Sequence, residues 1–327
     1  MSPIACDRHS NKDDKLETPL QLSSPLLTRL RAPLDARWAA MPTLARGVFL
    51  VSLGSFGLVL MAALAKFLGS RLPPFEILFF RSFVGLVCVI WVFRNDLMEP
   101  LRTRRPGAHF FRGIVGAGGN ACFFWTITHM MLADSLALQF SRPLWMIPMA
   151  LCFLSEVVGF RRAAVAGVGF LGVLLYARPF TAGFDPNALI GALGGLFAAL
   201  VVVAIKNLQT TENTKVIMFY YAFWNAFFAA LPAAFTWIMP TGTELMLLIL
   251  IGAMGMGGQA LITHGLGMGD ATALVPLDYV RVVYAAVLGY FLFGEIPNSW
   301  SFAGMGLIIA ASLYLVLTER RKPKPQS

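Results

Sequence analysis

Three polar side chains share one face of an otherwise apolar stretch near the end of the chain. Asp278, Arg281 and Tyr284 follow one another at intervals of three residues, whereas Val280 and Val283 fall on the other side of a helix. The stretch is long enough to cross a bilayer, and hydrocarbon around an acid and a base near its middle would be costly. We therefore expect this face to line a wet cavity, where Arg281 docks an anionic group and Asp278 sets its position. The alternative is that the two charges only neutralise each other within one helix.

Two further arginines fall inside apolar runs. Arg142 has no acid close by in its own run, so its counter-charge must come from another segment, a ligand or water. A structural ion pair with Asp278 is the alternative interpretation. Arg81 lies five residues after Glu76, and it either faces the cavity or reaches a backbone carbonyl at a broken helix.

Aromatic residues share the faces of two of these arginines. Trp145 and Tyr284 each lie three residues past an arginine and are placed to stack on a planar group of a substrate. Lys66, near the end of an apolar run, is expected to extend its amine to the lipid headgroups. The histidines are isolated, so we expect no metal ligand, cofactor or catalytic residue. The predicted substrate-binding residues are Arg81, Arg142, Trp145, Asp278, Arg281 and Tyr284.

Composition identifies the class of protein. Hydrophobic residues make up 57% of the chain and charged residues only 13%, and the mean hydropathy is +0.69. These values indicate an integral membrane protein. The net charge of +9 does not indicate nucleic-acid binding, because the basic residues gather in a tail and in connections between apolar runs.

The sequence predicts an all-α protein with ten transmembrane helices. Residues 1–45 are polar and interrupted by proline, which predicts a disordered cytoplasmic tail, and residues 319–327 form a basic cytoplasmic tail. The connections are too short for a soluble catalytic domain. The ten apolar runs lie at 47–69, 75–93, 109–129, 132–154, 163–178, 188–205, 215–238, 244–265, 271–293 and 300–317.

Lysine and arginine outside the spans predict the orientation. Twenty of them, Arg112 included, fall on the side of the N-terminus, whereas only Arg71 and Arg178 fall on the other side. Because cytoplasmic loops are enriched in these residues, both termini are expected in the cytoplasm and the protein in the inner membrane.

The chain repeats itself. Arg142 lies 14 positions before Glu156, and Arg281 lies 14 positions before Glu295. Upstream, Ala-Asp-Ser-Leu-Ala-Leu around Asp134 matches Gly-Asp-Ala-Thr-Ala-Leu, and the aspartates of both motifs suit helix N-caps. We therefore predict two five-helix repeats, residues 46–178 and 188–318. Five is odd, so the second repeat enters the membrane in the opposite sense, and inverted repeats of this kind are a structural basis for alternating access.

These motifs resemble a known family. Ala-Asp-Ser-Leu-Ala-Leu, Pro-Leu, Leu-Ser-Glu and Arg161-Arg162, followed by Gly-Asp-Ala-Thr-Ala, Asp-Tyr-Val-Arg and Phe-Gly-Glu, are similar to the EamA branch of the drug/metabolite transporter superfamily. The resemblance covers nearly all of residues 47–318. It implies the ten-helix fold and transport, and it leaves the substrate open, because the branch includes exporters of amino acids and importers of compounds such as riboflavin or S-adenosylmethionine. Ser155 departs from the glycine that usually precedes the glutamate of the first repeat.

The sequence therefore favours a secondary active transporter for a small polar metabolite, such as an amino-acid derivative or an organic anion. The nucleotide-binding pattern Gly-x-x-x-x-Gly-Lys-Ser/Thr is missing, so energy must come from an ion gradient, with a proton as the expected coupling ion, from exchange or from the substrate's own gradient. The expected partners are the substrate and the lipid bilayer, with the chain as a monomer or a homodimer. The alternatives are a membrane-embedded enzyme acting on a lipid or prenyl substrate, and a channel.

Overall fold

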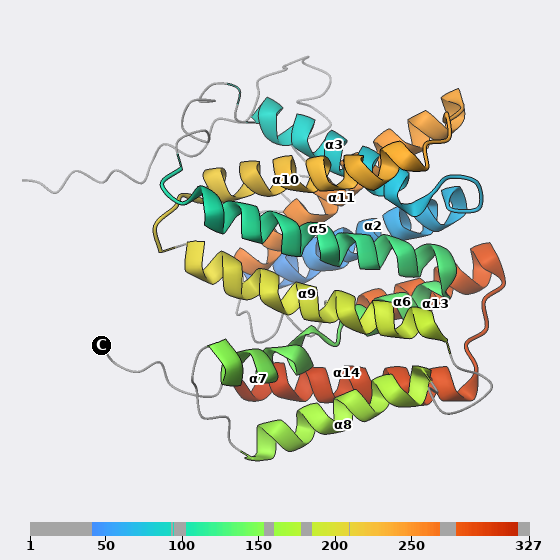
Figure 1. The fold of residues 1–327 in the computed structure, drawn as a ribbon. Coiled ribbons are helices and arrows are strands. Elements are labelled where there is room, and N and C mark those ends of the chain that lie inside the picture. Colours follow the sequence, from blue (N-terminus) through green and yellow to red (C-terminus); the bar gives the residue numbers. More distant parts are fainter. Residues whose placement is uncertain are drawn as a thin grey trace, which may run out of the picture. The chain divides into compact units, whose positions relative to one another are not determined.

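The computed structural model describes residues 41–92, 94, 103–153, 160–177, 185–208, 210–268 and 279–319. The chain divides into two units, Met1–Pro42 and Thr43–Ser327, and every described helix lies in the second unit. The described residues form helices and no strand. In chain order the helices are α2 (Thr43–Leu68), α3 (Pro74–Val92), α5 (Pro106–His129), α6 (Leu132–Gln139), α7 (Arg142–Phe153), α8 (Phe160–Ala177), α9 (Pro186–Leu208), α10 (Thr214–Phe235), α11 (Gly242–Gly267), α13 (Val280–Phe293) and α14 (Ser299–Glu319) (Figure 1).

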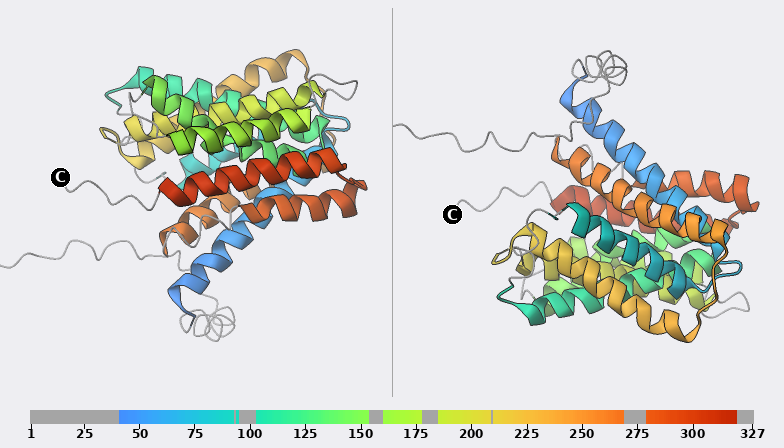
Figure 2. Two further views of the ribbon diagram at one scale, coloured as in Figure 1. Left: turned by 90° about the horizontal axis from the view of Figure 1, so that it is seen from below. Right: turned by 90° about the horizontal axis from the view of Figure 1, so that it is seen from above.

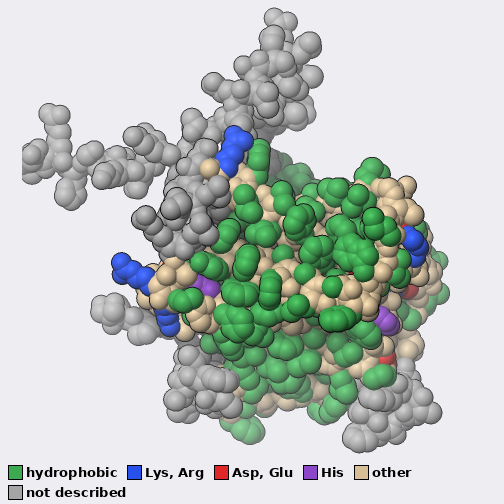
Figure 3. Space-filling model, turned by 45° about the horizontal axis from the view of Figure 1, so that its top comes forward, with side chains coloured by type: hydrophobic (Ala, Val, Ile, Leu, Met, Phe, Trp, Pro, Cys, Tyr) green, Lys and Arg blue, Asp and Glu red, His purple; other side chains and the backbone are tan. Residues whose placement is uncertain are grey.

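The helices are those of a membrane protein. Within the described ranges, five are long and apolar enough to cross a bilayer, and they lie in α2, α3, α9, α10 and α11. Three shorter apolar segments lie in α8, α13 and α14. Large apolar side chains point outwards, such as Phe291 with 76% of its surface exposed. Figure 3 shows one face on which hydrophobic side chains predominate, with the charged ones at its margins. A soluble protein rarely exposes so large an apolar patch, whereas a bilayer would cover it.

One predicted span is broken. The run at 132–154 was expected to be a single helix, but the structure divides it into α6 and α7 at Phe140 and Ser141. The cause is in the sequence: Pro143 has no N–H, so it cannot donate to the carbonyl of Gln139, where α6 ends. The chain turns there, and Leu144 donates its N–H to the carbonyl of Ser141 at 2.9 Å. Arg142 thereby becomes the first residue of a new helix.

Helices that are distant in sequence pack in pairs. The main pairs are α2 with α11, α5 with α9, α3 with α10, and α8 with α14. Figure 2 shows the blue α2 running alongside the orange α11. At this crossing a Cβ added to Gly54 would lie 2.6 Å from the carbonyl oxygen of Gly258. Only a residue without a side chain permits such an approach.

Candidate functional site: an arginine-lined cavity

Three arginines that the sequence places within apolar runs line one cavity. Arg81 comes from the middle of α3, Arg142 is the first residue of α7, and Arg281 is the second residue of α13. The cavity has a volume of about 200 Å³. Arg81 and Arg142 form no ion pair with any acid in the described part of the chain. Arg281 donates from Nε to the hydroxyl of Ser55 in α2 at 3.5 Å. Three chain segments thus converge on one positively charged space.

Equivalent points of the two halves meet at this cavity. Phe140 lies two residues before Arg142, and Tyr279 lies two residues before Arg281. The two rings stack on each other, with centroids 4.6 Å apart and planes inclined by 27°. Both rings line the cavity. The spacing that identified the repeat in the sequence therefore corresponds to residues that touch in space.

The other predicted site residues are not part of the described lining. Trp145 packs edge-on against Phe170 of α8, with ring centroids 4.7 Å apart. Tyr284 packs in the same manner against Phe56 of α2, at 5.6 Å. Each ring therefore supports the helix that carries a cavity arginine. Asp278 lies outside the described residues.

Three amide side chains of the lining, Asn120, Gln139 and Gln259, were missed by the sequence analysis. Two of them share a sequence pattern. Asn120 lies on α5 and Gln259 on α11, and both line the cavity. Each ends the same pattern, Gly-x-x-Gly-x-Gly-Gly followed by an amide, at residues 113–120 and 252–259. Each pattern ends the same number of residues before the cavity arginine of its own half. The repeated pattern and its equal distance from the two arginines could have identified both amides from the sequence. Reading each glycine separately hid the repetition.

The structure also corrects the placement of Arg112. This residue was counted among the cytoplasmic connections, but it lies inside α5 with only 6% of its surface exposed. Its guanidinium carbon is 4.3 Å from the ring centroid of Tyr221, which comes from α10. Arginine tolerates this burial because its planar, weakly hydrated guanidinium stacks well on an aromatic face.

A larger chamber adjoins the arginine cavity. Its volume is about 860 Å³, and Arg81 and Gln259 line both spaces. A third, narrower space of about 120 Å³ is lined by Arg112, Asn120 and Gln139. The large chamber reaches the end of the bundle at which α5 begins and α11 ends, where its walls include Thr263, His264 and Met268.

At the opposite end of the bundle, a partly buried ion pair lines a space of about 410 Å³ and joins α2 to the end of α13. Lys66 at the end of α2 lies 2.7 Å from Glu295, from Nζ to Oε1, and also donates to the carbonyl of Met130. Glu295 accepts the N–H of Leu132, at the start of α6, at 2.8 Å. Gly294 ends α13 with a φ of 65° and turns the chain so that this contact can form. The expectation that Lys66 extends to the headgroups is therefore wrong, because its amine is held inside the protein.

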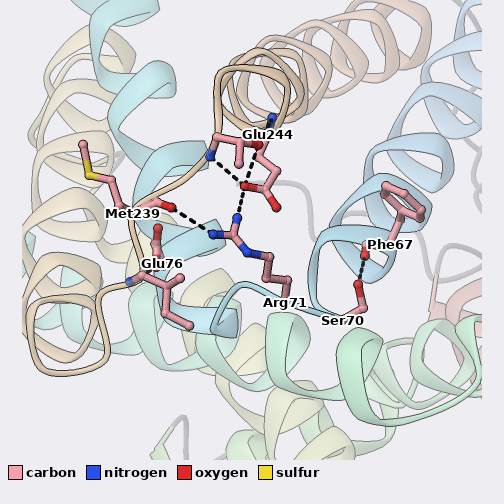
Figure 4. Close-up of polar contacts among 8 residues, drawn as sticks. Phe67, Ser70, Arg71, Glu76, Met239 and Glu244 are labelled. Atoms are coloured by element: carbon pink, nitrogen blue, oxygen red, sulfur yellow. Dashed lines mark hydrogen bonds and ion pairs between the residues drawn. The ribbon is translucent and has the colours of Figure 1, made fainter.

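A second, more exposed cluster lies at the same end (Figure 4). Arg71 follows α2, forms an ion pair with Glu244 of α11, and donates from Nη2 to the carbonyl of Met239 at 3.3 Å. Glu76, in the first turn of α3, accepts the N–H of Ile238 at 3.0 Å. These contacts join the connection between α2 and α3 to the connection between α10 and α11.

The structure also corrects the N-cap assigned to Asp134. Met131 is the N-cap of α6, whereas Asp134 is the third residue of that helix and has 2% of its surface exposed. The corresponding Asp270 lies outside the described residues, as does Glu156. Within the described ranges, no group of three or more His, Cys, Asp or Glu side chains is placed to hold a metal ion.

The fold and the cavity define a multi-pass helical membrane protein with a polar, positively charged interior. The chain matches the EamA-like transporter family over residues 45–178 and again over 186–317. It therefore belongs to this family, as its motifs predicted, and the match indicates a small-molecule transporter.

Individual relatives agree with this assignment. The chain is 30% identical to an S-adenosylmethionine uptake transporter of Rickettsia felis, over 84% of this chain and 95% of the relative. It is 31% identical to a pseudopaline exporter of Pseudomonas aeruginosa, over 84% of this chain and 97% of the relative. A solved crystal structure shares the fold with a TM-score of 0.54 at 20% identity, covering 83% of this chain and 99% of that structure.

Proposed function

We propose that this protein is a secondary active transporter that moves a small polar metabolite carrying a carboxylate or phosphate group across the inner membrane by alternating access. The observation that carries the proposal is the convergence of Arg81, Arg142 and Arg281 on one cavity. Arg81 and Arg281 are half-buried, whereas Arg142 is exposed at the cavity. A guanidinium group inside a membrane is costly unless something compensates it. A carboxylate or phosphate does so well, because it accepts two parallel hydrogen bonds from one arginine.

The helix ends strengthen this preference for an anion. Arg142 begins α7 and Arg281 lies in the first turn of α13. The helix dipole is positive at such an end, although in α7 Pro143 has no N–H and the N–H of Leu144 is already bonded to the carbonyl of Ser141. Transporters with broken helices use such half-helix ends to hold anionic groups of their substrates. Asp278 would then bind an amine of the same substrate.

We further propose ten spans in two inverted repeats, residues 46–178 and 188–318, with both termini in the cytoplasm. The helix pairs support this arrangement. A two-fold relation between the repeats exchanges the pair of α2 and α11 with the pair of α5 and α9. The same relation maps the pairs of α3 with α10 and of α8 with α14 onto themselves, and all four pairs are present. Because each repeat has an odd number of spans, the axis lies in the membrane plane.

The relatives support a substrate class without fixing a direction. One is named for uptake of S-adenosylmethionine, an amino-acid derivative with a free carboxylate, and another, equally similar, is named for export. In the proposed topology the large chamber lies towards the cytoplasm, and the Lys66–Glu295 cluster closes the outer end. This arrangement supports an inward-facing state, and we propose that a proton gradient or exchange drives the change to the outward-facing one.

The test is counterflow in proteoliposomes with radiolabelled S-adenosylmethionine as the first probe and a panel of carboxylate-bearing metabolites as competitors. The wild type should show saturable counterflow for at least one probe. Arg142→Met and Arg281→Met should each reduce it at least tenfold, and Arg281→Lys should also reduce it, because a lysine cannot bind a carboxylate in two-point fashion. Arg104→Gln removes an exposed positive charge and serves as the control. Counterflow that is unchanged in both methionine variants would refute the role of the arginines, and product formation without flux would point to an enzyme.

A further inference from the structure

The guanidinium of Arg112 in α5 is buried without a full set of hydrogen-bond partners. It is more than nine-tenths buried, and among the described residues no acceptor lies within hydrogen-bond distance of Nε or Nη1. No acid forms an ion pair with it in the same part of the chain. Stacking on Tyr221 eases the burial of the charge but gives these two nitrogens no acceptor, so the site calls for a ligand that accepts hydrogen bonds.

The surroundings of Arg112 are built as a rigid platform. Its guanidinium lies over the ring of Tyr221. Asn120 donates from Nδ2 to the hydroxyl of Tyr221 at 3.1 Å and to the side-chain oxygen of Asn225 at 2.7 Å. Asn225 donates from its own amide to the backbone carbonyl of Tyr221 at 2.8 Å. These contacts fix the ring and engage the nearby acceptors with one another, which leaves the donors of Arg112 available.

Packing does not require an arginine at this place. Counted from the repeated glycine pattern, the counterpart of Arg112 in the second half is Ile251, which is fully buried in the apolar core. The first half therefore carries a charge where the second half carries a hydrocarbon side chain. Only the first half has an arginine at this position, whereas Arg142 has an arginine, Arg281, at the equivalent position of the second half.

Two equivalent glycines make room for two arginines. A Cβ added to Gly116 would lie 2.7 Å from Nη1 of Arg112, and one added to Gly255 would lie 3.3 Å from Nε of Arg81. Gly116 and Gly255 occupy the same place in the repeated pattern. Each glycine lets a guanidinium lie close against a helix backbone beside the cavity.

Arg112 also lies between the large chamber and the central cavity. It lines the large chamber together with Arg81, which in turn lines the central cavity. It also lines the narrow space whose other walls include Asn120 and Gln139, both of which line the central cavity too. A ligand in the chamber therefore meets Arg112 and Arg81 before it reaches Arg142 and Arg281.

We infer that Arg112, held on Tyr221, forms a second anion-binding subsite that takes a carboxylate or phosphate group at the chamber side of the central cavity. Arg81 is shared by the two subsites. A substrate with one anionic group would occupy the subsites in turn, and one with two such groups would bridge them. The inference rests on the proposed function and extends it, since the substrate would have two anion-binding subsites rather than one.

Anion binding by the purified protein in nanodiscs tests the subsite without transport. Thermal unfolding is followed while inorganic phosphate is titrated at constant ionic strength, because a ligand that binds only the folded state raises the unfolding temperature saturably. The double variant Arg142→Met/Arg281→Met, which removes the central site, should keep a saturable response. Adding Arg112→Met should weaken the apparent affinity at least tenfold, whereas adding Arg104→Gln should leave it unchanged.

Arg112→Met is a fair replacement, because the equivalent core position accepts an apolar side chain. Its unfolding temperature without phosphate, equal to or above that of its parent, would show that the fold is intact. Arg112→Lys, which keeps the charge but not the planar group, should restore part of the response. A triple variant with Arg112→Met that responds like the double variant would overturn the subsite, as would a double variant with no saturable response.

The two proposals can fail separately. Counterflow that depends on Arg142 and Arg281 but is unaffected by Arg112→Met, in a protein without Arg112-dependent phosphate binding, would leave the transporter and remove the subsite. Arg112-dependent phosphate binding in a protein without counterflow would support the subsite and refute the proposed transport.

Discussion

The ion pair between Lys66 and Glu295 should stabilise the closed end of the bundle measurably. The two side chains are 2.7 Å apart and keep only 15% and 12% of their surface exposed. Breaking a buried pair by removing one partner costs about 3–5 kcal/mol. Glu295→Gln should lower the free energy of unfolding by ~3 kcal/mol. The loss lies at the low end of the range because the remaining lysine is partly solvated, and because the glutamine oxygen can still accept the N–H of Leu132.

A double-mutant cycle separates the pair from its surroundings. Lys66→Met, Glu295→Gln and the double variant are compared by thermal unfolding in detergent, where ~3 kcal/mol corresponds to a decrease of about 6 °C in the unfolding temperature. The double variant contains neither charge, so it should recover most of that loss, with a coupling of at least about 2 kcal/mol.

The matched control is the ion pair between Arg71 and Glu244, at the same end of the bundle. The side chain of Arg71 is 47% exposed. Exposed pairs contribute little, so the same cycle on Arg71→Gln and Glu244→Gln should change the unfolding temperature much less. Additive effects of Lys66→Met and Glu295→Gln, or equal couplings for the two pairs, would refute the reasoning.

Two further predictions concern packing. Gly54→Ala should destabilise the protein by about 1–3 kcal/mol, because its Cβ would meet the carbonyl oxygen of Gly258 at 2.6 Å. Gly57→Ala, in the same helix with nothing within 4 Å of its Cβ, should be neutral or stabilising, and equal unfolding temperatures would contradict the close contact between α2 and α11. Phe140→Ala and Tyr279→Ala should couple by about 1 kcal/mol in a cycle measured by thermal unfolding, because their rings stack across the repeat boundary. Strictly additive losses would show that the rings pack independently.

The sequence predicted the site from the cost of charge in hydrocarbon. Arg81, Arg142 and Arg281 lie within apolar runs, and that alone indicated a shared polar interior before any contact was known. The common spacing from Arg142 to Glu156 and from Arg281 to Glu295 indicated that two of these arginines occupy equivalent places. Both inferences depend on local composition and spacing, which a single sequence displays.

Contacts between distant segments were decided by the tertiary structure. Arg112 lies near a run end like the other arginines that the sequence assigned to the cytoplasmic side, and only its contact with Tyr221 of α10 reveals that it is buried. Lys66 has the sequence context of a side chain that extends to headgroups, yet Glu295 lies within 2.7 Å of it.

The class of protein and the central arginines follow from the sequence, because a charge near the middle of a span is costly in hydrocarbon, and the repeat follows from the spacing of its motifs. The partners of each polar side chain follow from the fold, because helices far apart in the chain supply them. Whether a charge near a helix end faces lipid headgroups, an ion partner or a cavity depends on which helix packs against it, and that is a property of the assembled bundle alone.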